Sequence, residues 1–157
     1  MKIEKSIVIN TRSEMVFDYL RITINQDNFS VWNMTDPNMK KQYKGKDGTI
    51  GFIYSWDSMM KNVGAGEQEI TGIEEGKSIE YSVRFSRPMQ NVAKTNFQII
   101  RESENRTVVA WIFDSPSKFP MSLLSPIFKI MLGKDMEKGL SNLKAILEKK
   151  ITLSLSE

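Results

Sequence analysis

The feature that most constrains the fold is an alternation of apolar and polar residues that runs, with short interruptions, from Ile50 to Phe113. A period of two is typical of β-strands with one buried face. The alternation is clearest in residues 79–87, where one face carries Ile79, Tyr81, Val83, Phe85 and Arg87. Further strands are predicted at residues 2–9, 39–44, 50–56, 63–73, 92–101 and 106–114. Short connections between them indicate an antiparallel meander.

Helical periodicity precedes and follows this strand-rich region. Two short helices are expected after the first strand, one with apolar residues at Met15, Val16, Tyr19 and Leu20 and one at residues 28–32. Beyond Gly133 the spacing predicts a long helix over roughly residues 134–149, with an apolar stripe of Met136, Leu140, Leu143 and Leu147. Residues 151–157 alternate weakly and are interpreted as an extra edge strand or a loose tail.

This order of elements predicts an α+β fold in which a curved antiparallel sheet of six or seven strands wraps around the long C-terminal helix. The chain of 157 residues suits one domain. We expect that domain to span residues 1–150, with 151–157 as a C-terminal tail. Glycines inside the strands permit the sheet to bend. The helix should cover only part of the apolar face, which leaves a cavity between sheet and helix.

Two missing residue types narrow the function. The chain has no Cys, which excludes disulfides and thiol nucleophiles, and no His, the usual general base near neutral pH. Any acid–base chemistry would rest on other groups, and the carboxylates Glu14, Asp57 and Asp114 show no spacing that pairs them. We therefore expect no metal, no cofactor and no catalytic motif.

Charge and hydropathy address partners and compartment. The net charge is +3 and acidic residues interleave with basic ones, so no nucleic-acid footprint is present. The N-terminus lacks a signal-peptide pattern, and the apolar stretch from Met121 to Leu132 is too short to span a bilayer. The expected location is the cytoplasm, without stable membrane insertion. The segment from Phe119 to Leu132 is interpreted either as a gate at the cavity mouth or as a membrane contact.

Residues 1–150 resemble the polyketide cyclase/dehydrase-like branch of the START-related SRPBCC superfamily. The resemblance lies in "KIEKSIVINTRSEMVFDYL", "SWDSMMKNVGAGEQEI", "YSVRFSRP" and "LGKDMEKGLSNLKAILE". It implies a helix-grip fold, which agrees with the order of elements above. It also implies a hydrophobic ligand such as a lipid, sterol or polyketide. A minority of the family are cyclases, dehydratases or hydrolases, so fold alone does not assign an activity.

Strand parity selects the candidate ligand-binding residues. The aromatic side chains share one predicted face, and core packing is the alternative interpretation for each ring. The hydroxyls of Tyr54 and Tyr81 are interpreted as polar handles, and Gln68 and Arg87 share the inward parity. For Arg87 the alternative is a strand end bent into solvent by Pro88, and for Gln68 it is a bulge that reverses the side chain. The full candidate set is Phe52, Tyr54, Trp56, Gln68, Tyr81, Phe85, Arg87, Trp111, Phe113, Met131, Met136 and Leu140.

Three functions remain open from the sequence. The first is binding or transport of a small hydrophobic ligand without catalysis. The second is a cyclase- or dehydratase-type enzyme, in which Tyr54, Tyr81 or Arg87 polarises a substrate oxygen and a carboxyl group moves the proton. The third is a protein-interaction module without a ligand. The oligomeric state is not indicated by any pattern.

Overall fold

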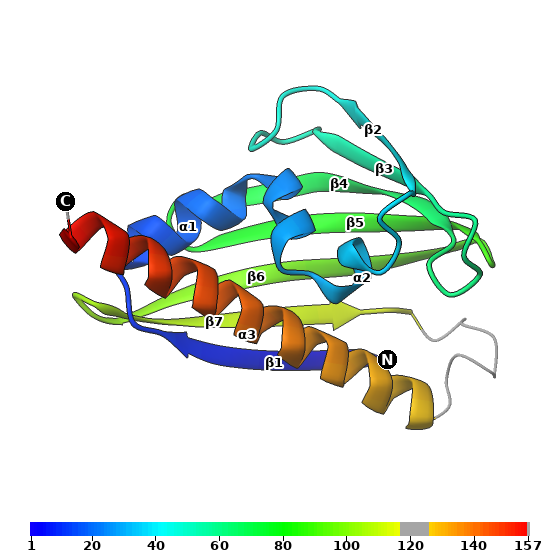
Figure 1. Cartoon of the computed structure of the whole chain (residues 1–157). Coiled ribbons are helices and arrows are strands. Elements are labelled where there is room, and N and C mark those ends of the chain that lie inside the picture. Colours follow the sequence, from blue (N-terminus) through cyan, green and yellow to red (C-terminus); the bar gives the residue numbers. More distant parts are fainter. Residues whose placement is uncertain (117–125, 157) are drawn as a thin grey trace.

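The computed structural model of the protein describes residues 1–116 and 126–156, and it shows a curved β-sheet around a long helix (Figure 1). The strands are β1 (Lys2–Ile9), β2 (Lys40–Lys44), β3 (Ile53–Asp57), β4 (Ala65–Glu74), β5 (Ser78–Arg87), β6 (Asn91–Ser103) and β7 (Arg106–Asp114). The helices are α1 (Ser13–Arg21), the 3-10 helix η1 (Thr23–Asn28), α2 (Val31–Met34) and α3 (Pro126–Ser156).

The sheet has seven strands in the order β1-β7-β6-β5-β4-β3-β2. Consecutive strands from β2 to β7 pair as antiparallel neighbours, and β1 pairs antiparallel with β7, so that Lys2 lies opposite Asp114. The predicted antiparallel meander of six or seven strands is therefore confirmed. Register shifts in β4, at Ala65/Gly66 and Ile70/Gly72, interrupt the ladder and allow the sheet to curve.

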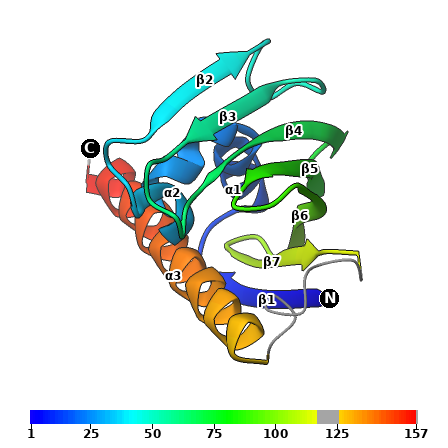
Figure 2. The same cartoon turned by 90° about the vertical axis from the view of Figure 1, so that its right-hand side faces the viewer.

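Helix α3 lies on the concave side of the sheet together with the short helices (Figure 2). Its predicted apolar stripe is buried: the exposed fraction is 4% for Met136, 1% for Leu140, 0% for Leu143 and 1% for Leu147. The last three belong to one core cluster with Phe17, Phe29 and strand residues such as Tyr81 and Phe97. The period of the stripe thus fixes which side of the helix the sheet grips.

Several boundaries differ from the sequence prediction. The second short helix, expected at residues 28–32, is replaced by the 3-10 helix η1 and the single turn of α2, which lie on either side of residues 29–30. Helix α3 begins at Pro126 rather than near Lys134, since the first turn of a helix leaves its N–H groups unbonded and accepts proline there. It continues to Ser156, so the expected edge strand after residue 150 is wrong. The division into a domain of residues 1–150 and a C-terminal tail stays a prediction. Ile50 is 65% exposed and lies in the turn before β3, so it does not share the buried face of Tyr54 and Trp56.

Candidate functional site

A cavity of about 460 Å³ lies between the concave face of the sheet and the helices. Its volume falls within the range of roughly 300–1,000 Å³ that is typical of small-molecule sites. All three tryptophans of the chain, Trp32, Trp56 and Trp111, line it. Other apolar lining residues come from the sheet, the segment just before β2 and the first turns of α3, among them Met39, Tyr54, Val83, Phe85, Phe113 and Met136.

The lining changes in character from the interior to the mouth. The charged residues that line the cavity, Lys61, Arg87 and Asp135, are exposed. The polar residues Gln26, Ser30 and Thr95 are buried, with exposed fractions of 4%, 4% and 9%. The mouth therefore lies among the β3–β4 loop, the β5–β6 loop and the start of α3. Among residues 1–116 and 126–156, the polar groups that line the interior are neutral.

Aromatic side chains form the walls in fixed mutual orientations. The ring of Phe85 meets Trp32 and Trp56 edge-on, with centroid distances of 6.5 Å and 5.9 Å. On the other side of the cavity, Trp111 packs against Phe97 at 4.9 Å and against Phe29 at 6.0 Å. Such tilted and edge-to-face pairs stabilise one another beyond simple burial, so the walls do not depend on a ligand for their shape.

The hydroxyl of Tyr54 already donates a hydrogen bond within the protein, so it does not offer that hydrogen to a ligand. It donates to Asp27 Oδ1 at 2.6 Å, and the same carboxylate accepts from Asn33 Nδ2 and Lys41 Nζ, each at 3.0 Å. Burial and the hydrogen bond to Asp27 raise the pKa of the Tyr54 phenol, so it stays protonated at neutral pH. Tyr54 therefore contributes its ring to the wall, while its hydroxyl is engaged as a hydrogen-bond donor to Asp27.

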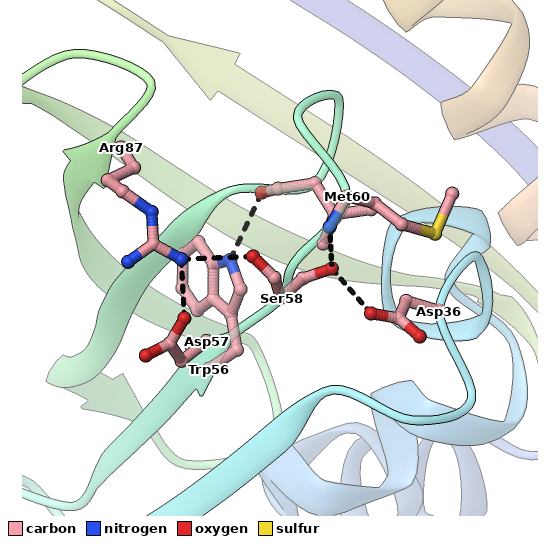
Figure 3. A network of polar contacts seen from close by, with 7 residues as sticks. Asp36, Trp56, Asp57, Ser58, Met60 and Arg87 are labelled. Carbon is pink, nitrogen blue, oxygen red and sulfur yellow. Dashed lines mark hydrogen bonds and ion pairs between the residues drawn. The ribbon is translucent and has the colours of Figure 1, made fainter.

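A polar network anchors the β3–β4 loop at the cavity mouth (Figure 3). Arg87 donates to the Asp57 carboxylate and to the Ser58 carbonyl, the latter at 2.9 Å. The Ser58 hydroxyl donates to the buried carboxylate of Asp36 and accepts from the Met60 N–H at 3.0 Å. Trp56 Nε1 donates to the Val63 carbonyl at 3.3 Å. The ion pair with Asp57 makes Arg87 part of this anchor rather than a free cation facing the interior.

The structure brings most of the predicted residues to one cavity. Those that line it are Tyr54, Trp56, Gln68, Phe85, Arg87, Trp111, Phe113, Met131 and Met136. For the strand residues, shared parity is the reason, because alternate residues of every strand face the same side of the sheet. Met131 and Met136 come from the first turns of α3. The bulge that would reverse Gln68 is not seen there: Gln68 lies opposite Tyr54 and Val83 in regular pairing. Their role in ligand binding stays a prediction.

Phe52, Tyr81 and Leu140 lie in the core and do not line the cavity, which corrects their predicted positions. Phe52 precedes β3 and stacks on Tyr43 at 6.3 Å. Tyr81 has the inward parity but is only 1% exposed, and its hydroxyl donates to the Leu20 carbonyl at 3.4 Å. Leu140 lies one helical turn beyond Met136, where α3 already packs on the core. Tyr81 thus lies in the core, outside the cavity lining.

Sequence reasoning missed several lining residues. Val83 shares the parity of Phe85 and Arg87, so the alternation itself could have indicated it. Three more come from the short helices: Gln26 from η1, Ser30 from the link between η1 and α2, and Trp32 from α2. Periodicity carries no signal for a sheet-facing position in such short elements. Residues 119–125 of the proposed gating segment, including Met121, lie outside the described residues. Met131 is 60% exposed at the cavity mouth.

Among the described residues, Asp135 is the carboxyl group that lines the cavity, and partial loss of its hydration there raises its pKa. The carboxylates considered from the sequence, Glu14, Asp57 and Asp114, do not line the cavity. Within residues 1–116 and 126–156, no group of three or more acidic side chains is placed to hold a metal ion. No helix in these ranges combines the length and hydropathy needed to cross a membrane.

Removing metal ions is expected to leave stability unchanged. Carboxylates alone hold hard cations weakly unless they cluster, and the described residues contain no such cluster. Thermal unfolding of untagged protein before and after dialysis against excess chelator should give the same midpoint. Stoichiometric zinc or iron in elemental analysis, or a chelator-dependent drop in the midpoint, would contradict this prediction.

Comparisons with known proteins agree with this architecture. Residues 1–148 match the model of the family described as polyketide cyclase / dehydrase and lipid transport. A search of curated proteins gave no match. Among solved structures, a protein from Mesorhizobium loti is similar with a TM-score of 0.69, 12% identity, and coverage of 95% of this chain and 98% of that chain.

Two further structures extend the comparison. A START superfamily protein from Mycobacterium smegmatis has a TM-score of 0.63 at 14% identity, covering 94% of this chain and 97% of that one. DynU16, a protein of the dynemicin biosynthetic locus, has a TM-score of 0.64 at 11% identity, covering 94% of this chain and 47% of that one. At these identities the likeness shows the fold alone.

Proposed function

The chain belongs to the polyketide cyclase / dehydrase and lipid transport family, and we propose that it binds or carries a small hydrophobic molecule in the cavity between sheet and α3. The membership and the helix-grip fold confirm the resemblance drawn from the sequence. The observation that carries the proposal is the cavity itself, whose aromatic walls are joined by buried neutral polar groups and whose charged lining residues lie at the mouth. A cytoplasmic location stays a prediction.

The chemistry of the lining supports binding over catalysis. The enzyme hypothesis needs Tyr54, Tyr81 or Arg87 to polarise a substrate oxygen. The hydroxyl of Tyr54 donates its hydrogen bond to Asp27, and that of Tyr81 donates to the Leu20 carbonyl. Arg87 forms an ion pair with Asp57. An interaction module without a ligand would call for a filled interface between sheet and helix, whereas this one contains a cavity of about 460 Å³.

Filling the cavity should abolish ligand binding. Val83 lines the cavity and is 7% exposed, so Val83→Phe places a ring in the space that a ligand would occupy. The matched control is Val92→Phe on β6, where Val92 is 46% exposed and does not line the cavity. We expect Val83→Phe to weaken binding of the neutral fluorophore N-phenyl-1-naphthylamine by at least about tenfold, equal to roughly 1.4 kcal/mol. Val92→Phe should bind as the unaltered protein does.

Fluorescence titration measures this directly, because the probe brightens when it leaves water. Circular dichroism should first establish that both variants are folded. Failure of the unaltered protein to bind the probe, or equal binding by Val83→Phe, would contradict the proposal. Native mass spectrometry of protein purified from its own host provides an independent test, since a retained ligand would be detected by its mass.

A further inference from the structure

The first two turns of α3 carry apolar side chains on their solvent side. Ile127, Ile130 and Met131 are exposed, at spacings of three and four residues that place them on one side of the helix. Lys134 continues that row by one further turn. Beyond Lys134 the exposed residues of α3 are almost all polar or charged. The apolar outer face is therefore confined to the end of the helix that borders the cavity mouth.

Two loops bring further apolar side chains to the same end of the molecule. Met59 in the β3–β4 loop is 97% exposed, and Met89 in the β5–β6 loop is also exposed. Both loops and the start of α3 lie at the end that faces the viewer in Figure 2. Met89 and Met131 also line the cavity, so the exposed apolar surface extends to the mouth. We call these residues the mouth patch: Met59, Met89, Ile127, Ile130 and Met131. An exposed apolar patch rimmed by polar residues commonly marks a site of interaction with a protein or a membrane.

Lysine side chains flank the mouth patch. Lys61 follows the exposed methionines of the β3–β4 loop, and Lys129 and Lys134 lie on the first turns of α3. All three are exposed, and none of them forms an ion pair with another described residue. They are therefore available to an anionic partner.

The acidic residues at this end do not cancel that charge. Asp57 forms an ion pair with Arg87. Asp114, the last residue of β7, lies opposite Lys2 in the strand pairing. Asp135 lines the cavity, and partial loss of its hydration raises its pKa, which favours its neutral form. Positive charge therefore predominates around the mouth patch.

We propose that the mouth patch docks reversibly on the surface of a bilayer that contains anionic phospholipids. Isoleucine and methionine side chains enter the boundary between headgroups and acyl chains, while the flanking lysines stay at the level of the anionic headgroups. Protein–protein interfaces are depleted in lysine, and a second copy of the chain would bring like charges together. Docking goes beyond the proposed function, and it lets a hydrophobic ligand pass between bilayer and cavity without crossing water. Residues 127–132 belong to the segment for which the sequence left a membrane contact open.

Sedimentation with sucrose-loaded vesicles tests the docking. The vesicles consist of phosphatidylcholine alone or of equal parts of phosphatidylcholine and phosphatidylserine. One double variant, Ile127→Ser with Ile130→Ser, removes apolar surface from the mouth patch, and another, Lys129→Gln with Lys134→Gln, removes charge beside it. The matched controls change exposed residues that do not line the cavity, and they are Ile50→Ser with Ile100→Ser and Lys77→Gln with Lys149→Gln. Circular dichroism should first establish that all four variants are folded.

We expect the unaltered protein to sediment with the anionic vesicles and only weakly with the neutral ones. Each double variant at the patch should weaken the partition by about tenfold or more, and the controls should partition as the unaltered protein does. Salt at about 1 M should release the protein in part. An unaltered protein that stays in solution with the anionic vesicles, or patch variants that sediment as the controls do, would overturn the inference. A protein with an acidic surface would then be the remaining occupant of the patch. The proposed function would stand in either case, because N-phenyl-1-naphthylamine binding is measured without vesicles.

A fluorescent label tests which face of the protein meets the bilayer, even if a double variant fails to fold. The chain has no Cys, so one introduced cysteine is the sole site for a thiol-reactive nitrobenzoxadiazole label. The label at Met59→Cys or at Ile130→Cys should brighten on the anionic vesicles, because it leaves water. The label at Ile100→Cys, on β6, should not change. Equal brightening at all three positions, or brightening at Ile100→Cys alone, would overturn the inference.

Discussion

Replacing Leu140 with alanine is expected to lower the free energy of unfolding by about 2–5 kcal/mol, the usual range for deleting a buried leucine side chain. Leu140 is 1% exposed and belongs to the core cluster that joins α3 to the sheet. The substitution removes apolar surface from the core and leaves a space that the surrounding core residues fill only in part. A loss of this size is a large share of the stability of an ordinary domain.

Urea unfolding followed by circular dichroism measures the loss, provided that the slope with denaturant is unchanged. The matched control is Ile127→Ala on the same helix, where Ile127 is 71% exposed and should change stability by less than about 0.5 kcal/mol. If Leu140→Ala unfolded at the same urea concentration as Ile127→Ala, the packing of Leu140 in the core between α3 and the sheet would be contradicted.

The second large effect is expected at Gly64, which joins the β3–β4 loop to β4. Its φ is +67°, and a Cβ there would lie within 3 Å of the Arg87 carbonyl carbon and oxygen. Gly64→Ala should therefore combine the strain of a left-handed alanine, about 1–2 kcal/mol, with an overpacking cost of roughly 1–3 kcal/mol. We expect a total loss of roughly 2–5 kcal/mol in the free energy of unfolding.

Gly76 provides a control that separates the two contributions. Its φ is +76°, but a Cβ there would meet nothing within 4 Å. Gly76→Ala should therefore show the backbone strain alone, about 1–2 kcal/mol. Urea unfolding of both variants gives the difference, which measures the clash with β5. Equal losses in the two variants would mean that the loop and the end of β5 do not approach as closely as described.

Gly64→Ala should also disturb the cavity mouth, whereas Gly76→Ala should not. Gly64 follows the loop that carries Lys61, Asn62 and Val63, all of which line the cavity. Displacing Arg87 would strain its contacts with Asp57 and Ser58. Folded Gly64→Ala protein should therefore bind N-phenyl-1-naphthylamine more weakly than folded Gly76→Ala protein.

Strand parity carried most of the prediction of the cavity. A regular strand sends alternate side chains to one face, so Tyr54, Trp56, Gln68, Phe85 and Trp111 could be placed on one side without coordinates. Where the period ended, prediction failed. Ile50 continued the alternation in the sequence but lies in a turn, and the weak alternation after residue 150 belongs to the end of α3.

The sequence by itself determined the order of elements, the antiparallel sheet and the buried face of α3, because periods of 2 and 3.6 residues state directly which side of a strand or helix avoids water. Only the tertiary structure decided where along that shared face the core ends and the cavity begins. Tyr81 and Phe85 have the same parity, yet Tyr81 is fully buried in the core and Phe85 lines the cavity. Likewise, η1 brings Gln26 to the cavity wall, although no periodicity marks it. Parity fixes the face of the sheet to which a side chain points. Whether that side chain is then covered by the core or left facing the cavity depends on elements that are distant in sequence and pack across the sheet.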